Sequence, residues 1–355
     1  MPTPSVTPTS QVSPVILSVS RSTDIPAFYA EWFMNRLREE YAVWYNPFNR
    51  KPVRVSFNRV KAIVFWSKNP APLLLYLPEL DRRGIRYYFQ FTLNDYEKEG
   101  FEPNVPPLSQ RIATFKQLST LIGKERVIWR FDPLILAPGT TPRQLLTRIW
   151  HLGNQLRGCT DKLVFSFADV LAYRKVQQNL VRDTSCFTKE NVTSAEPSLS
   201  QQQELIEGLV KLRDHWHAEG WQLTLATCAE QINLDAYGIA HNRCIDGELI
   251  ARLWHDDPEL LYYLHTGKLP EPDLFGNIPP LPATAKPLKD KGQRRACGCI
   301  PSKDIGMYNT CPHLCTYCYA NASRSTVLTN HLRHDPAAPF LIPPDASTTL
   351  TPENQ

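Results

Sequence analysis

Ala296-Cys-Gly-Cys-Ile-Pro-Ser-Lys-Asp-Ile-Gly-Met-Tyr-Asn-Thr-Cys-Pro-His-Leu-Cys-Thr-Tyr-Cys-Tyr-Ala-Asn321 contains five of the chain's nine cysteines, and we interpret the rest of the sequence from this stretch. Within it, Cys311, Cys315 and Cys318 have the spacing C-x3-C-x2-C. Three thiolates on a short loop can bind three irons of a cubane cluster and leave the fourth iron open to another ligand. The spacing therefore predicts a [4Fe-4S] cluster. A structural zinc site and a disulfide are the alternatives.

The other cysteines contain a second candidate set. Cys228 and Cys244 are 16 residues apart, and Cys297 and Cys299 form a C-x-C pair just before the first set. Four thiolates are the number that a second [4Fe-4S] cluster or a closed zinc site requires. The alternative is that Cys228 and Cys244 are small buried apolar residues, as free cysteines often are. The remaining two, which have no partner at metal-binding spacing, are interpreted as structural: Cys159 and Cys186.

The composition favours one large folded domain with extended ends. A hydrophobic content of 42% excludes a wholly disordered chain, and 31 prolines indicate rigid loops and extended termini. The net charge of +4 permits an anionic substrate such as a nucleotide or nucleic acid without requiring one. Residues 1–14 lack the features of a signal peptide, and no apolar run is long enough to cross a membrane. We therefore expect a cytoplasmic protein with a disordered leader over residues 1–14 and no membrane partner.

Short apolar runs alternate with amphipathic segments along most of the chain. The runs predict strands, and the segments, whose apolar residues recur at helical spacing, predict helices. The predicted strands cover residues 15–20, 62–66, 87–92, 127–131, 163–167 and 222–226, and the predicted helices cover 26–40, 70–82, 108–122, 142–156 and 205–216. Strands separated by helices in this way predict an α/β fold with a parallel (β/α) barrel or partial TIM-like barrel.

The C-terminal third is expected to complete this barrel. The barrel itself covers residues 15–268, and a Pro-rich connector over 269–295 leads the chain back across it. Residues 296–324 form the cysteine-rich iron-sulfur segment, in which 303–309 is predicted to be a final strand that delivers the cysteine loop. The tail, 325–355, is rich in Pro, Thr and Asn and is expected to be disordered.

Polar side chains lie at or just after the ends of five predicted strands. The carboxyl ends of the strands form the catalytic face of a (β/α) barrel, so we expect many of these side chains to line one site. For any single one of them, turn formation or helix capping is the alternative. The candidates for catalytic roles are Arg21, Asp24, Lys68, Asn69, Arg130, Asp132 and Glu230.

The run Thr310-Cys-Pro-His-Leu-Cys-Thr-Tyr-Cys-Tyr-Ala320 resembles the cluster loop of the radical S-adenosylmethionine (SAM) superfamily, and in particular that of photolyase-like members such as spore photoproduct lyase. The resemblance implies that the open iron binds SAM, whose reductive cleavage yields a 5′-deoxyadenosyl radical. It also implies that Tyr317, the aromatic residue before the third cysteine, belongs to the cofactor-binding site. In that superfamily the loop follows the first barrel strand, whereas here it comes last. The resemblance therefore implies a circularly permuted radical SAM barrel.

Several longer blocks resemble the bacterial family known as domain of unknown function 1848, over about residues 15–322. They are Ser18-Val-Ser-Arg-Ser-Thr-Asp-Ile-Pro-Ala27, Val64-Phe-Trp-Ser-Lys-Asn-Pro70, Tyr87-Tyr-Phe-Gln-Phe-Thr92, Val127-Ile-Trp-Arg-Phe-Asp-Pro133 and Thr227-Cys-Ala-Glu230. Membership of this family implies a radical-SAM-like iron-sulfur protein and leaves the substrate open.

We therefore expect a radical SAM enzyme of unknown substrate. Arg130 and Asp132 are candidate partners for the carboxylate and the ribose or amine of SAM, because a guanidinium can bind a carboxylate bidentately. A reductant protein of flavodoxin or ferredoxin type is the expected electron donor. By analogy with the photolyase-like loop, a nucleic acid or nucleotide is the candidate substrate.

Two alternatives to radical chemistry remain open from the sequence. The first is a non-radical iron-sulfur or zinc protein that binds nucleic acid or a protein partner, with aromatic residues such as Trp66 and Trp129 stacking on bases. The second is a metal-independent barrel hydrolase that uses Asp24 or Glu230 as a general base. SAM cleavage and the metal content distinguish these alternatives from the leading hypothesis.

Overall fold

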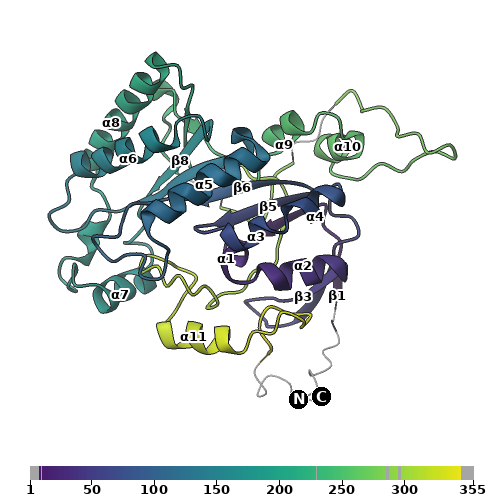
Figure 1. Cartoon of the computed structure of the whole chain (residues 1–355), viewed down its shortest axis with the longest axis horizontal. Coiled ribbons are helices and arrows are strands. Elements are labelled where there is room, and N and C mark those ends of the chain that lie inside the picture. The colour runs from purple at the N-terminus through teal and green to yellow at the C-terminus, as the bar shows by residue number, and fades with distance from the viewer. Residues whose placement is uncertain (1–7, 9, 229, 285–287, 295–296, 345–355) are drawn as a thin grey trace.

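An eight-stranded parallel sheet is the centre of the fold (Figure 1). The computed structural model describes residues 8, 10–228, 230–284, 288–294 and 297–344. The strands of this sheet lie side by side in the order β10-β9-β8-β7-β6-β5-β2-β11. Their bounds are β2 (Ile16–Val19), β5 (Ala62–Ser67), β6 (Arg86–Thr92), β7 (Val127–Leu134), β8 (Lys162–Phe167), β9 (Thr224–Thr227), β10 (Ala240–His241) and β11 (Lys303–Asp304).

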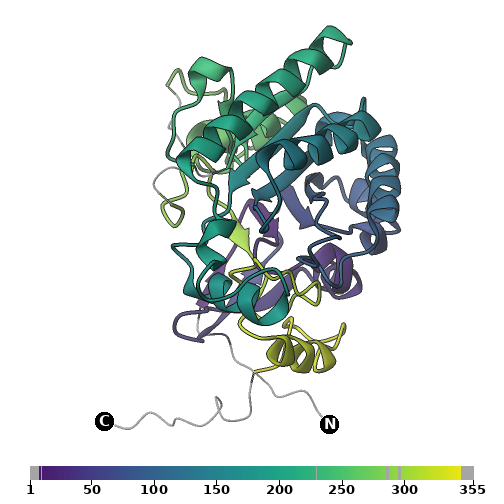
Figure 2. The ribbon, with the colours of Figure 1, turned by 90° about the vertical axis from the view of Figure 1, so that its left-hand side faces the viewer.

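Helices surround the sheet (Figure 2). Most of them follow a strand and pack back against it, as in repeated β-loop-α units. None of the described helices is long and apolar enough to span a membrane. The helices are α1 (Ile25–Phe28), α2 (Ala30–Arg38), α3 (Ala71–Leu74), α4 (Leu77–Arg82), α5 (Leu108–Ile122), α6 (Pro142–Leu156), α7 (Arg174–Asp183), α8 (Leu199–Ala218), α9 (Gly247–Leu253), α10 (Pro258–Thr266) and α11 (Arg324–Leu332).

Alternate residues of the strands enter two different hydrophobic cores, because successive side chains of a strand point to opposite faces of the sheet. In β5, Ile63 and Phe65 belong to the large core that contains most of the helix residues. Val64, between them, belongs to a smaller core that includes residues of α9 and α10. Burial on both faces explains why these strands are continuous apolar runs in the sequence.

The two edges of the sheet, β10 and β11, are not paired with each other among the described strands. Two other segments connect them. The Ile300 N–H donates to the Ile245 carbonyl at 3.1 Å, and the Ile245 N–H donates to the Cys299 sulfur at 3.3 Å. We call this contact between residues 244–245 and 299–300 the seam. The fold is thus a barrel-like parallel α/β structure that strand pairing alone does not close.

The predicted α/β class and the six predicted strands are confirmed, with small shifts at the ends. The helices α5 and α6 have the predicted bounds. The predicted helix over 26–40 is two helices, α1 and α2, which meet at Tyr29. The predicted final strand, 303–309, is shorter than expected, because only Lys303–Asp304 pairs with β2.

The expectation of disorder at the two ends is wrong for their described parts. Residues Ser10–Val12 form β1, which pairs with the unpredicted hairpin β3 (Tyr41–Tyr45) and β4 (Pro52–Ser56) in a small sheet of order β1-β4-β3. In the tail, α11 is followed by buried apolar residues, including Phe340, that pack against β3. Burial of these side chains offsets the cost of ordering the chain. Residues 1–7, 9 and 345–355 lie outside the described part.

A close backbone approach follows β11. A Cβ atom at Gly306 would lie 1.9 Å from the Ser20 Oγ and 2.6 Å from the Ser22 Oγ. Real side chains cannot come this close, so glycine alone fits here without a shift of the neighbouring loop. Because Gly306 precedes the cysteine loop, this packing fixes where that loop begins.

We therefore expect Gly306→Ala to lower the free energy of unfolding by about 1–3 kcal/mol, the usual cost of overpacking a tight site. Urea denaturation followed by tryptophan fluorescence measures this change. The matched control is Gly292→Ala, at an exposed glycine whose nearest contact would be an Asp290 oxygen at 3.3 Å. Equal stability of the two variants would contradict the close approach.

Candidate functional site

A cavity of about 1750 Å³ lies at the carboxyl ends of the sheet strands. This is the position at which barrels of parallel strands build their sites. Its wall includes the final residues of several strands, among them Ser67, Thr92, Phe167 and Thr227. Both candidate cysteine sets also line it, the first with Cys311, Cys315 and Cys318 and the second with Cys228, Cys244, Cys297 and Cys299. We call these sets the loop cysteines and the seam cysteines.

The loop cysteines lie on a tightly turned segment after β11. Leu314, between the first two cysteines, has a left-handed backbone with a φ of 55°. This conformation is uncommon for a residue other than glycine, and such strained residues concentrate at functional sites. The Cys318 N–H donates to the Cys315 carbonyl at 3.1 Å, so the turn continues through the third cysteine. The result is that the three thiols of one short loop line the same cavity.

Asp24, at the start of α1, anchors this loop. One of its carboxylate oxygens contacts the His313 Nε2 at 2.8 Å and accepts the Lys68 N–H at 2.7 Å. The other accepts from the Ser67 hydroxyl at 2.7 Å and from the Ala27 N–H at 3.0 Å, which caps the helix. With these four contacts, Asp24 serves as a junction between the cysteine loop, α1 and the end of β5.

A buried polar cluster holds Tyr317, the residue before the third cysteine. Its hydroxyl donates to Glu102 and accepts from the Lys68 ammonium at 2.8 Å and from the Asn94 amide at 3.1 Å. Glu102 also pairs with Lys68 at 2.7 Å and with Arg111 at 3.3 Å. Burial opposes ionisation of Glu102, but the two cations outweigh it and lower the pKa of this carboxyl below its ordinary value. These polar side chains therefore keep a positive charge, that of Lys68, beside the loop cysteines.

Cys315 is buried, Cys311 and Cys318 are half-buried, and the three thiols are close enough to influence one another. Burial, together with the charges of Asp24 and Cys318, raises the pKa of Cys311 to about 12. Burial also raises the pKa of Cys315 well above its ordinary value, although Lys68 opposes the shift. Thiols of this kind ionise readily only beside a compensating cation, and metal ligands must be thiolates. The Ala320 N–H points at the Cys318 sulfur at 3.4 Å, a contact that favours a thiolate at that position.

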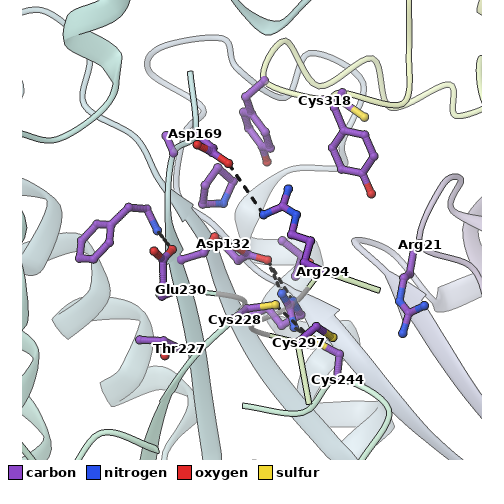
Figure 3. A pocket seen from close by; sticks show the side chains of 18 of the residues that line it. Arg21, Asp132, Asp169, Thr227, Cys228, Glu230, Cys244, Arg294, Cys297 and Cys318 are labelled. Atoms are coloured by element: carbon purple, nitrogen blue, oxygen red, sulfur yellow. Dashed lines mark hydrogen bonds and ion pairs between the residues drawn. The ribbon is translucent and has the colours of Figure 1, made fainter. Parts of the chain in front are cut away.

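The seam cysteines come from three separate segments. Cys228 follows β9 and Cys244 follows β10, and their sulfur atoms are 3.2 Å apart. Figure 3 shows these two with Cys297 on one side of the cavity and Cys318 elsewhere on its wall. A hydrogen bond with Cys299 lowers the pKa of Cys297 to about 7, although burial opposes the shift. The structure thus brings together all four cysteines of the predicted second set.

In the described part of the chain, no group of three or more His, Cys, Asp and Glu side chains is arranged so that it could hold a metal ion. A structural zinc ion takes four ligands at one centre. In a cubane cluster each thiolate binds a different iron, so its ligands are spread around a larger object.

Arg130 and Asp132, the predicted SAM partners, are paired with each other. Arg130 contacts the Asp132 carboxylate and donates to the Gln90 amide oxygen and to the Cys244 sulfur, both at 3.2 Å. Asp132 also accepts a hydrogen bond from the Ser166 hydroxyl. Both predicted residues line the cavity, and Arg130 lies beside the seam cysteines.

The other predicted polar residues are divided between the cavity and its surroundings. Arg21 lines the cavity, and its buried Nη2 has no hydrogen-bond partner in the described structure. Glu230 lines the cavity and accepts from the Phe167 N–H at 2.9 Å, and burial raises its pKa. Lys68 and Asp24 line it as well. Asn69 does not, and its N–H donates to the Ser67 hydroxyl in a turn.

Sequence reasoning missed several residues that shape the site. His313 lies inside the cysteine spacing, and its position between Cys311 and Cys315 was the signal available for it. Glu102 lies between β6 and α5, where no periodic pattern marks it. Arg294 lines the cavity and pairs with Asp169 at 3.8 Å, as Figure 3 shows. Only the three-dimensional structure brings these residues to the cysteines.

The fold and the site define a class of α/β proteins in which a barrel-like parallel sheet carries two sets of cysteines around one cavity. The model of a known family, described as Domain of unknown function (DUF1848), matches residues 16–320. The chain belongs to this family, which confirms the family resemblance found in the sequence. Comparison with curated proteins and with solved structures finds no match.

The contacts of Asp24 predict that Asp24→Asn destabilises the cysteine loop. Asparagine is also a good helix cap, so α1 keeps its cap. The amide NH2 that replaces the second carboxylate oxygen is a donor, however, so it cannot accept from the Lys68 N–H, and the Asp24–Lys68 hydrogen bond is lost. An unsatisfied buried group costs about 1–3 kcal/mol, and we expect a loss of this size in the free energy of unfolding. Urea denaturation of the anaerobically purified protein measures it.

The control for this experiment is Asp169→Asn, because the Asp169 side chain is 53% exposed and pairs only loosely with Arg294. It should leave the unfolding free energy within about 0.5 kcal/mol of the wild-type value. A fully stable Asp24→Asn protein that has lost activity would instead assign Asp24 a catalytic role.

Proposed function

We propose that this chain is a radical SAM enzyme in which Cys311, Cys315 and Cys318 hold a [4Fe-4S] cluster. The observation that carries the proposal is that the three thiols of the C-x3-C-x2-C loop all line one large cavity. Three ligands leave one iron of such a cluster open. When bound, the cluster would supply the electron that cleaves SAM to a 5′-deoxyadenosyl radical. The proposal leaves open which substrate this radical would attack and what product would form.

The residues around the loop suit this role. Lys68 and the N–H of Ala320 favour thiolates over thiols, and Asp24 and Tyr317 fix the loop from two sides. The cavity also offers space. Pockets for single ligands of drug size usually enclose about 300–1,000 Å³, so a cavity of about 1750 Å³ has room for SAM together with a substrate.

Groups that could recognise SAM lie on the same wall. Arg21 offers a buried, unpaired Nη2, which is suited to a carboxylate. Arg130 and Asp132 remain candidates for the carboxylate and the amine or ribose, and their mutual pair would have to open or share its hydrogen bonds with SAM. In this proposal the electron donor is a cytoplasmic reductant protein of flavodoxin or ferredoxin type.

The second candidate function is a non-radical metal protein that binds nucleic acid or a protein. The cysteines support this function as well, but the aromatic residues do not favour it. Trp129 is fully buried, and Trp66 lies beside two guanidinium groups, with its ring centre 5.2 Å from Arg130 and 5.4 Å from Arg21. A base could therefore not stack on Trp129, and Trp66 is already covered in part.

SAM cleavage is the decisive test. We expect the anaerobically reconstituted, dithionite-reduced protein to give a cubane signal in electron paramagnetic resonance that SAM alters, and to release 5′-deoxyadenosine. Cys315→Ala should lower that release by at least about tenfold, which corresponds to about 1.4 kcal/mol in the barrier. Chromatography of the nucleoside products measures the release.

Cys159→Ala is the matched control, because Cys159 does not line the cavity, and this variant should keep the wild-type rate. The proposal of a radical enzyme would be contradicted if SAM did not alter the signal of the cluster and no 5′-deoxyadenosine were released. That result would favour the second candidate function.

A further inference from the structure

The seam is the place where the two edges of the large sheet meet without strand pairing. Cys244 lies just beyond β10 at one edge, and Cys299 lies just before β11 at the other. The Ile245 N–H donates to the Cys299 sulfur, and the backbones of Ile245 and Ile300 are hydrogen-bonded at 3.1 Å. Each edge therefore brings a thiol to the seam, and a neighbouring thiol accompanies each, Cys228 on one side and Cys297 on the other.

Several donors fix Cys244 in the centre of this group. The Tyr88 hydroxyl and the Gln90 amide donate to its carbonyl at 2.7 and 2.9 Å. Its sulfur receives the Arg130 guanidinium at 3.2 Å and the Asn242 amide at 3.4 Å. Donors directed at sulfur are the contacts that stabilise a thiolate bound to a metal. Tyr88, Gln90 and Arg130 come from the neighbouring strands β6 and β7, so the sheet itself positions this thiol.

Two arginines supply positive charge at the same place. Arg130 is 3% exposed, and Arg21 has a buried Nη2 without a partner in the described structure. Both guanidinium groups lie within 5.4 Å of the centre of the Trp66 ring. Two cations held near one ring repel each other unless anionic groups lie close by. Asp132 pairs with Arg130, and the carboxylate of Asp304 lies near Arg21, whose guanidinium forms no ion pair in the described structure. Four thiolates with a bound metal centre would add negative charge beside both cations.

We propose that Cys228, Cys244, Cys297 and Cys299 bind a second iron-sulfur cluster. Four thiolates complete the ligand set of a cubane, so every iron of this cluster would be held by the protein. All four thiols line one large cavity, which leaves room beside them for a cluster, whereas a structural zinc site is closed around its ion. This centre does not depend on SAM binding at the loop cysteines.

The second cluster would also complete the barrel. Cys228 and Cys244 belong to the β9 and β10 edge, whereas Cys297 and Cys299 belong to the segment that leads into β11. A metal centre with ligands from both sides links the two edges covalently where strand pairing is missing. We therefore expect cluster loading to slow hydrogen exchange at Ile245 and Ile300, the residues that form the backbone contact of the seam.

The full-length variant Cys311→Ala/Cys315→Ala/Cys318→Ala isolates this centre. After anaerobic reconstitution it should retain about four irons and four sulfides per chain, against about eight of each in the wild type. Its electron paramagnetic resonance signal should not respond to SAM. Adding Cys244→Ala and Cys299→Ala should remove the remaining iron, and far-UV circular dichroism shows whether that protein is folded. The milder Cys297→Ser, added alone to the triple variant, should lower the iron content without unfolding it, because Cys297 is only partly buried.

The matched control adds Cys186→Ala to the triple variant, and its iron content should not change, because Cys186 is outside the cavity wall. A folded triple variant that binds no iron, or that binds one zinc in its place, would overturn the proposal. Iron that remains after the seam cysteines are replaced would overturn it too. If the wild-type protein does not cleave SAM, these iron measurements remain valid. They therefore test the second cluster separately from the radical enzyme.

Discussion

The carboxylate of Asp304 holds the last strand of the sheet against the first. It accepts from the hydroxyls of Ser18 and Ser20 at 2.7 Å each, from the Arg21 N–H at 2.8 Å and from the Gly306 N–H at 2.9 Å. Hydrogen bonds to a charged group contribute about 1.5–3 kcal/mol each, more than those between neutral groups. Because β11 offers only two residues for pairing, the position of the loop cysteines depends on this carboxylate.

The buried charges around Tyr317 need an explanation beyond stability. The side chains of Glu102 and Arg111 are 3% and 1% exposed, so their desolvation is expensive. Apolar residues of the same size in place of such a group are often as stable or more stable. What apolar residues could not provide is a fixed position for the Tyr317 hydroxyl and a cation, Lys68, beside Cys315. The buried charged side chains around Tyr317 are therefore better explained by the requirements of the cysteine loop than by those of the hydrophobic core.

The parallel strands were predictable because both of their faces are buried, which leaves a continuous apolar signal in the sequence. The hairpin β3–β4 carries no comparable signal, since β4 contains Arg54 among its valines. The described tail was misjudged for a related reason. Its polar and Pro-rich composition hides a few apolar residues, such as Phe340, whose partners on β3 lie far away in the sequence.

The sequence predicted which cysteines and strand-end residues line the cavity, but it did not predict the neighbours that folding brings to them. The loop cysteines were marked by their spacing, and the strand-end residues Arg130 and Asp132 by their position. The partners that decide what these residues do, such as Glu102 for Lys68 or Cys244 for Arg130, lie on other elements. No local pattern encodes such pairs, because the sequence separation between them is arbitrary.

The order of strands in space matters more to this site than their order along the chain. A parallel sheet presents the carboxyl ends of all its strands on one side, so a loop after β11 reaches the same cavity as a loop after β2. β11 pairs with β2 although almost the whole barrel separates them in the sequence. A cysteine loop at the end of the chain can therefore reach the site as directly as one near its start. The segment that delivers it passes the seam first, so Cys299 and Cys311 are separated only by residues 300–310. The hydrogen bonds of Asp304, in the middle of that segment, consequently bear on the position of the loop cysteines and of Cys297 and Cys299, whereas Cys228 and Cys244 are placed by the segments after β9 and β10.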